Sequence, residues 1–206
     1  VLISAAFFML LTGLAYPLFT TLVANVLFPF QARGSLVERD GLVIGSAVIG
    51  QHFTRAEYFQ GRPSMTLGAD PLDPSKSVAQ PYNAGSSGAS NLGPTSQKLI
   101  DAVALRVDAY RQQNGLAADA QVPVDAVTSS ASGLDPHISV ANAQIQVSRV
   151  ARLRHLPEAD LLKLVNAHTE QRTFGLLGEP RVNVLQLNLA LDALKPAHQP
   201  PLAASE

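Results

Sequence analysis

The sequence predicts an α+β protein with one N-terminal transmembrane helix followed by a single soluble mixed α+β domain. Two observations lead there. Positions 1–32 contain no charged residue, and after Arg33 the apolar residues follow helical spacing in some segments and strand-like spacing in others. The expected division is an anchor helix at 1–32, a soluble domain at 33–195 and a flexible tail at 196–206.

The segment 1–32 is long enough to cross a bilayer, whose hydrocarbon core of roughly 30 Å needs about 20 helical residues. A cleaved signal peptide has an apolar region of only about 7 to 15 residues, so a retained anchor is favoured. Pro17 removes a backbone donor and is expected to kink the helix, while Gly13 would let a partner helix approach closely. Because the sequence opens on Val1, flanking charges do not decide the orientation.

Composition narrows the classes of function. The net charge is −1 and no long basic run occurs, which argues against a nucleic-acid partner. The sequence contains no cysteine, which excludes disulfides, thiolate metal sites and thiol nucleophiles.

The first part of the soluble domain is predicted to form a hairpin and a long loop. Two short strands, at 35–37 and 42–48, flank an Asp40-Gly41 turn signal. The segment 58–93 is so rich in Gly, Pro, Ser and Asn that it predicts a loop without helix or strand. Phe59 and Tyr82 are among its few apolar side chains, and we interpret it as an ordered contact loop.

The second part predicts one strand, at 122–128, and four helices. The first helix follows Pro94 and ends at Gly115, and the second is capped by Ser139. A third follows Pro157 and is expected to bury Leu161, Leu162 and Val165, and a fourth spans 182–194, ending before Pro196.

Three constellations could carry chemistry, and each has a plainer interpretation. Ser132, Asp135 and His137 resemble a nucleophilic triad but lie within one turn, where local backbone hydrogen bonds are the expected role. His137, His168, Glu170 and Glu179 lack the spacing of a metal-binding helix, so salt bridges and capping are expected for His168, Glu170 and Arg172. The Gly-rich run 85–96 lacks the lysine of a phosphate-binding loop.

Several blocks together resemble the C subunit of the bacterial Kdp-type potassium-transporting ATPase. Their order and spacing carry the resemblance, since no block is decisive alone. They are Gly45-Ser46, Ile49-Gly50-Gln51 with Phe53, Tyr58-Phe59, Gly61-Arg62-Pro63-Ser64, Tyr82-Asn83, Ser90-Asn91-Leu92-Gly93-Pro94-Thr95, Val122-Pro123-Val124-Asp125, Ser132-Gly133-Leu134-Asp135-Pro136-His137-Ile138-Ser139, Arg149-Val150-Ala151-Arg152, His168-Thr169-Glu170, Gly178-Glu179-Pro180-Arg181-Val182-Asn183-Val184-Leu185 and Leu187-Asn188-Leu189-Ala190-Leu191.

The resemblance implies a non-catalytic accessory subunit of a high-affinity, ATP-driven potassium uptake pump. Its partners would be a channel-like potassium-binding subunit, a P-type ATPase subunit and a small membrane peptide. It further implies an inner-membrane protein with a periplasmic domain and a catalytic chaperone that raises the pump's ATP affinity. ATP would be used by the complex, and this chain alone would bind no cofactor, so we expect an indirect effect.

The motifs supply a set of candidate contact or structural residues. These are Gly13, Phe59, Arg62, Tyr82, Asn91, Asp135, His137, His168, Glu170, Glu179, Arg181 and Asn188. Two other classes stay open at this stage: a membrane-anchored periplasmic hydrolase using Ser132, and a free-standing binding module.

Overall fold

The computed structural model describes residues 1–194, so the predicted flexible tail at 196–206 lies outside the described residues. The chain divides into two compact units, Val1–Val48 and a second unit from Ile49 on. One apolar N-terminal helix precedes a domain of helices and small sheets, which confirms the predicted fold class.

The first unit contains one continuous apolar helix, Leu2–Leu27, with none of its candidate membrane span buried. It consists of α1 (Leu2–Leu10), the π-helical turn η1 (Leu11–Ala15) and α2 (Tyr16–Leu27). The π-turn ends two positions before Pro17, whose missing N–H and bulky ring disturb the α-helical pattern. Side chains such as Thr12 and Thr20 return their hydroxyls to backbone carbonyls one turn back, at 2.7 and 3.0 Å.

The predicted single helix over 1–32 is too long. Phe28 leaves the helical conformation (φ −135°), and a separate short helix, α3 (Pro29–Ala32), follows. Pro29 explains the break because the residue before a proline is disfavoured in the α region. The predicted hairpin is confirmed: β1 (Leu36–Arg39) pairs antiparallel with β2 (Leu42–Ser46), and Asp40 and Gly41 have positive φ in the turn.

The second unit contains two small sheets and five helices among its described residues. They are β3 (Leu67–Ala69), β4 (Ser77–Ala79), α4 (Gln97–Asn114), α5 (Val124–Val127), β5 (His137–Ser139), α6 (Val140–Arg154), α7 (Glu158–Ala167), β6 (Thr169–Glu170), β7 (Arg181–Asn183) and α8 (Val184–Ala193). β3 and β4 pair as a hairpin, and β5, β7 and β6 form an antiparallel sheet in that order.

Two sequence predictions are wrong here. The segment 58–93 is not free of strands, since it contains the β3–β4 hairpin. The predicted strand at 122–128 is instead the short helix α5, which begins after Pro123 and carries Asp125 in its first turn. An acidic residue at a helix N-terminus is electrostatically favourable and outweighs the strand preference of the flanking valines.

The four longer helices agree with the predictions in place but not in every bound. Gly115 ends α4 in the left-handed conformation, and the Ser139 hydroxyl accepts the Asn142 N–H at 3.1 Å to cap α6. Two details differ. Leu162 on α7 is 38% exposed, not buried, and the last helix begins only at Val184 because the preceding residues form β7.

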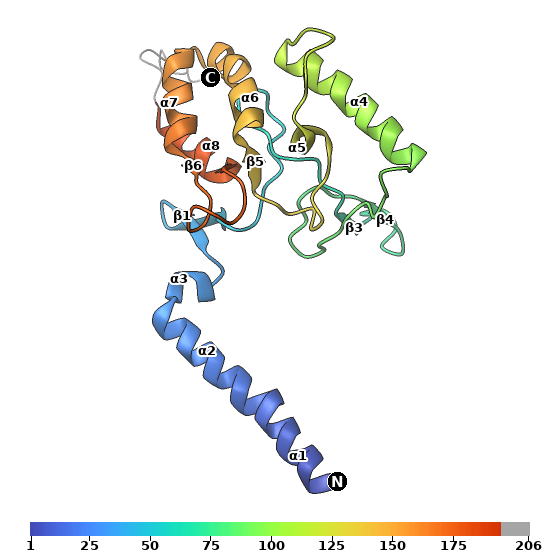
Figure 1. The fold of residues 1–206 in the computed structure, drawn as a ribbon, viewed down its shortest axis with the longest axis vertical. Helices are drawn as coiled ribbons and strands as arrows, with labels where there is room; N and C mark the ends of the chain where they lie inside the picture. The colour runs from blue at the N-terminus through green and yellow to red at the C-terminus, as the bar shows by residue number, and fades with distance from the viewer. Residues whose placement is uncertain (195–206) are drawn as a thin grey trace, which may run out of the picture. The chain divides into compact units, whose positions relative to one another are not determined.

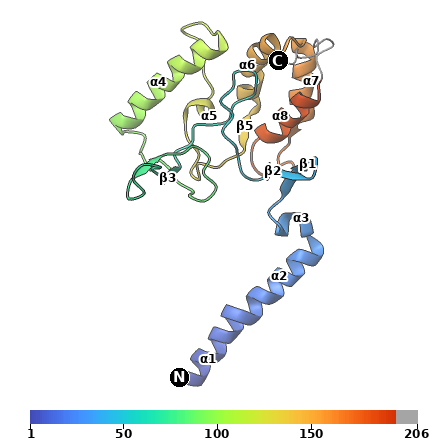
Figure 2. The same cartoon turned by 180° about the vertical axis from the view of Figure 1, so that it is seen from behind.

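The core lies where α6, α7 and α8 meet the β5–β7–β6 sheet. In both views α4 lies on the opposite side of this unit from α7 (Figures 1 and 2). The fully covered core side chains include Phe59, Leu161, Val165, Leu187 and Leu191. Phe59 is the one member from the long loop, so this residue belongs to the core and is not an exposed contact, contrary to our interpretation of the loop.

The stretch 56–60 reaches the core as a turn and loop segment outside any helix or strand. Side chains from α6 and α8 satisfy its backbone instead. Asn188 accepts the Phe59 N–H and donates to the Phe59 carbonyl, both at 2.9 Å, and Gln146 does the same for Gln60 at 2.8 and 3.1 Å. We call this set of bonds the amide clamp.

Two arginines extend the amide clamp. Arg149, 3% exposed, donates to the carbonyls of Ala56 and Tyr58, and Arg154 donates to the Glu57 carbonyl at 3.0 Å. Burial lowers the pKa of Arg149 below its ordinary value. Its charge is still offset by these carbonyls and by the side-chain oxygens of neighbouring amides.

Replacing Asn188 with leucine should destabilise the protein by about 2–4 kcal/mol, because it leaves two buried backbone groups of Phe59 without partners. The measurement is denaturant unfolding of the full chain in detergent, followed by circular dichroism. Gln97→Leu is the control, since it removes only an exposed bond to Asp101 and should change stability by less than about 0.5 kcal/mol. Equal stability of the two variants would contradict the role of the amide clamp.

Candidate functional site

Six of the twelve candidate residues form one connected polar chain in the structure. In order along it they are Tyr82, Arg62, Asp135, His137, Glu170 and Arg181. We call this the polar chain. From Arg62 onward, guanidinium or imidazole side chains alternate with carboxylates, so each carboxylate lies between two nitrogen-bearing groups.

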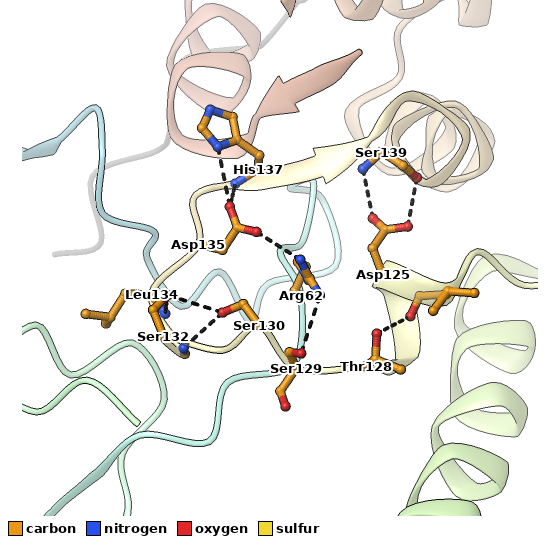
Figure 3. A network of polar contacts seen from close by, with 12 residues as sticks. Arg62, Asp125, Thr128, Ser129, Ser130, Ser132, Leu134, Asp135, His137 and Ser139 are labelled. Carbon is orange, nitrogen blue, oxygen red and sulfur yellow. Dashed lines mark hydrogen bonds and ion pairs between the residues drawn. The ribbon is translucent and has the colours of Figure 1, made fainter. Parts of the chain in front are cut away.

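Asp135 is at the centre of the polar chain, with both carboxylate oxygens engaged (Figure 3). Arg62 donates to Oδ2 at 2.9 Å, the His137 backbone N–H donates to Oδ1 at 3.0 Å, and the His137 Nδ1 lies 3.4 Å from Oδ1. Burial acts to raise the pKa of Asp135, but the bonds from His137 and Arg62 outweigh it and hold the pKa below its ordinary value. Asp135 is therefore ionised at neutral pH.

The three-stranded sheet assembles the other end of the polar chain. His137 begins β5, Glu170 ends β6 and Arg181 begins β7, and in the register of the sheet Arg181 lies opposite Glu170. The His137 Nε2 is 3.8 Å from the Glu170 Oε2, which accepts from Arg181 Nε at 3.0 Å. Residues far apart in sequence thus meet because short strands pair.

Tyr82 is fixed by a tight slot. Its hydroxyl donates to the Arg62 carbonyl at 2.8 Å, and its backbone has a positive φ of 59°. A Cβ on Gly50 would collide with the Tyr82 ring, and a Cβ on Gly61 would lie 2.5 Å from its hydroxyl. Both motif glycines are thus explained by close approach. Burial raises the pKa of Tyr82 to about 12, so the phenol keeps its proton as a donor.

The geometry does not favour the hydrolase interpretation. Ser132 Oγ accepts the Leu134 N–H at 3.1 Å and lies 3.4 Å from the Ser130 Oγ, as expected for a turn (Figure 3). The two imidazole nitrogens of His137 face the carboxylates of Asp135 and Glu170, so the ring is not oriented as a base for Ser132.

The remaining candidates are spread over the fold. His168 Nδ1 lies 2.9 Å from the Leu164 carbonyl at the end of α7, and Glu179 pairs with Arg172 at 2.6 Å, as capping and salt bridging predict. Asn91 has a left-handed φ of 52°, and a Cβ on Gly13 would meet no heavy atom within 4 Å. Within residues 1–194 no group of three His, Asp or Glu is arranged to hold a metal ion.

Sequence reasoning missed Asp125 as an organising residue. Its carboxylate accepts the Ser139 N–H and hydroxyl, both at 2.8 Å (Figure 3). It also accepts from the Asn142 side chain at 2.9 Å. It lines a cleft of about 510 Å³ together with Asp135, His137 and other residues of the polar chain. In the sequence, the only sign of this role was the place of Asp125 in the motif block Val122-Pro123-Val124-Asp125.

The polar residues of α6 were also missed, although they left a signal. Asn142, Gln146 and Arg149 follow one another at helical spacing along a side of the helix that is buried. Polar groups at such positions must be hydrogen-bonded, which indicates a network and not a plain apolar core. Tyr110 of α4 joins this network through Asn142 Oδ1 at 2.8 Å.

Comparison with known proteins gives a family match over both units. The model of the KdpC family, "K+-transporting ATPase, c chain", matches residues 1–193. The chain belongs to the KdpC family. A Potassium-transporting ATPase KdpC subunit of Rhodopseudomonas palustris strain BisB18 is 61% identical over 186 residues, 90% of this chain and 92% of that protein.

Further KdpC relatives agree. Proteins of the same name from Methylobacterium nodulans and Bradyrhizobium diazoefficiens are each 59% identical, over 90% and 88% of this chain and 90% and 89% of their own lengths. The resemblance inferred from the motif blocks is thereby confirmed, and the matched KdpC region includes every residue of the polar chain and of the amide clamp.

Asp135→Asn should cost about 1–3 kcal/mol of stability at pH 7, since charged hydrogen bonds to His137 and Arg62 are lost. Because the folded-state pKa of Asp135 is lowered, its contribution is present above the unfolded value of about 3.9 and is lost as pH falls through the folded value. The difference from the wild-type protein should therefore shrink below pH 4.

Unfolding of the full chain in detergent at pH 7 and at pH 3 provides the measurement. Asp101→Asn, at an exposed helical position, is the matched control and should differ little from the wild-type protein at both pH values. A cost for Asp135→Asn that is the same at both pH values would show that the charge of Asp135 is not what stabilises the site.

Proposed function

We propose that this chain is a non-catalytic accessory subunit of a high-affinity potassium-transporting P-type ATPase, which it stabilises and regulates. The single observation that carries the proposal is the family match, because it spans the apolar helix and the folded unit together. This favours a subunit over an anchored hydrolase or a free-standing binding module. The partners are a channel-like potassium-binding subunit, a P-type ATPase subunit and a small membrane peptide.

In this proposal Leu2–Leu27 crosses the inner membrane once, and the second unit lies on the periplasmic side. The helix supports a membrane role because its apolar surface is uncovered and its hydroxyls bond to its own backbone. Gly13 leaves open space beside the helix and is the position where a partner helix can approach closely.

The effect on ATP is indirect in this proposal, and the chain itself binds no cofactor. The Gly-rich run 85–96 supports this, since several of its backbone donors are used within the fold. The Gly85 N–H bonds to Asn83 Oδ1 and the Gly88 N–H to the Ser132 carbonyl, at 3.1 and 2.9 Å. A catalytic chaperone outside the membrane then acts by binding one state of the pump more tightly than another, because equal binding shifts nothing.

The first expected outcome is co-purification. A tagged full chain extracted from membranes in mild detergent should bring the potassium-binding and ATPase subunits with it. Gly13→Leu should lower their recovery by about tenfold, the effect of losing 1.4 kcal/mol of helix packing. Gly93→Leu is the control, since Gly93 also has open space around it but lies outside the membrane helix. Elution of the wild-type chain alone would refute the proposed function.

The second expected outcome concerns the side of the membrane. The sequence has no cysteine, so Leu72→Cys introduces a unique thiol at a side chain that is 95% exposed. A membrane-impermeant maleimide should label it in intact spheroplasts, because the proposed location is periplasmic. Labelling only after permeabilisation would place the unit inside.

Saturable ATP binding by the purified full chain would exclude the indirect mechanism.

A further inference from the structure

An exposed apolar turn connects β6 and β7. We call residues 172–179 the apolar tip. Phe174, Leu176 and Leu177 are 90, 79 and 64% exposed. Other strongly exposed apolar side chains of the second unit, such as Leu72 and Leu105, are scattered singly, which is ordinary for a protein surface. Three within four positions form a local apolar patch, and such patches mark interaction sites.

The apolar tip is an ordered turn. The Thr173 N–H bonds to the Leu177 carbonyl at 2.9 Å, and the N–H groups of Leu176 and Leu177 both bond to the Thr173 carbonyl. Backbone donors satisfied within the turn can be buried against a partner without the cost of lost hydrogen bonds. The apolar tip can therefore form a contact from which water is excluded.

The backbone at Phe174 and Gly175, in the middle of the apolar tip, is strained. Phe174 has φ 55° and Gly175 φ 73°, so a bulky residue occupies the left-handed region that favours glycine. Such strain costs on the order of 1–3 kcal/mol and is concentrated at functional positions. The strained conformation adds no core packing to the second unit, because it holds the Phe174 side chain in solvent.

The charges around the apolar tip indicate what kind of surface covers it. Arg172 pairs with Glu179 at 2.6 Å, and Arg181 pairs with Glu170 at 3.0 Å. An anionic lipid surface attracts unpaired basic residues, whereas here each arginine is already neutralised by a carboxylate. Apolar side chains surrounded by paired, mutually neutralised charges instead complement an uncharged recess in a protein.

We propose that the apolar tip inserts Phe174 and Leu176 into an uncharged apolar recess on a partner subunit of the pump. This inference rests on the proposed function. A buried aromatic anchor surrounded by near-neutral contacts is the usual form of an interface hot spot. The short strands β6 and β7 join the apolar tip to the core sheet, so the contact is rigidly linked to the polar chain through Glu170 and Arg181.

The test is photo-crosslinking in the intact complex in native membranes. Phe174→p-benzoylphenylalanine places the probe in the middle of the apolar tip, and Leu72→p-benzoylphenylalanine is the matched control at an equally exposed side chain. The expected result is a crosslink from position 174 to a pump subunit, identified by mass spectrometry, and none from position 72. A crosslink from position 174 to lipid alone, or no crosslink, overturns the proposal.

A second measurement uses Phe174→Ser and Leu72→Ser in the tagged full chain. Phe174→Ser should reduce subunit recovery by about tenfold or more, as expected for losing one buried aromatic anchor, with an unchanged melting temperature. Leu72→Ser should leave recovery unchanged. Wild-type recovery with Phe174→Ser overturns the inference alone, whereas failure of the wild-type chain to recover any subunit refutes the proposed function.

Discussion

The fold of the second unit depends on the hydrogen bonds that satisfy the backbone of a turn and loop segment, which has no partner strand. Residues 56–60 carry Phe59 into the core, and their buried backbone groups must be hydrogen-bonded. Asn188 and Gln146 each bind one residue of this segment through both amide atoms, and Arg149 and Arg154 bind its remaining carbonyls. Side chains from two helices thereby replace a neighbouring strand.

The amide clamp also restricts the position of Arg62 in the polar chain. Gln60, the last residue that it holds, is two positions before Arg62, so the clamp limits where the Arg62 side chain can reach. Arg62 then meets Asp135, while its carbonyl receives the Tyr82 hydroxyl in the slot that Gly50 and Gly61 leave open. Core packing and the polar chain are thus joined through the short backbone segment 60–62, and a change in the first is expected to disturb the second.

Sequence signals were sufficient to predict the elements whose formation depends on residues close together in the chain. The Asp40-Gly41 hairpin, the Ser139 cap and the Gly115 helix end all appear as predicted, because each depends on residues close in sequence. The apolar helix was equally clear, although its end at Leu27 was not, since Phe28 and Pro29 are as apolar as the residues before them.

Non-local elements could not be predicted in the same way. β5, β6 and β7 have only three, two and three residues, too few to show alternation. They form through pairing between residues far apart in sequence, such as His137 with Asn183. The same limit explains the error at Phe59, whose partner Asn188 is 129 positions away. The motif blocks named all six residues of the polar chain, but only the folded structure shows that they touch.

This arrangement accounts for how a small domain can hold a strained, exposed turn. The apolar tip leaves and re-enters the sheet through β6 and β7, where Val182 is completely buried and lies opposite Thr169 and Ile138. Glu170 and Arg181 close its base with an ion pair that also belongs to the polar chain. Strain at Phe174 persists only if the surrounding structure determines it, and here the core sheet supplies that constraint. A turn fixed in this way loses little conformational entropy on binding, which favours contact with a recess of matching shape.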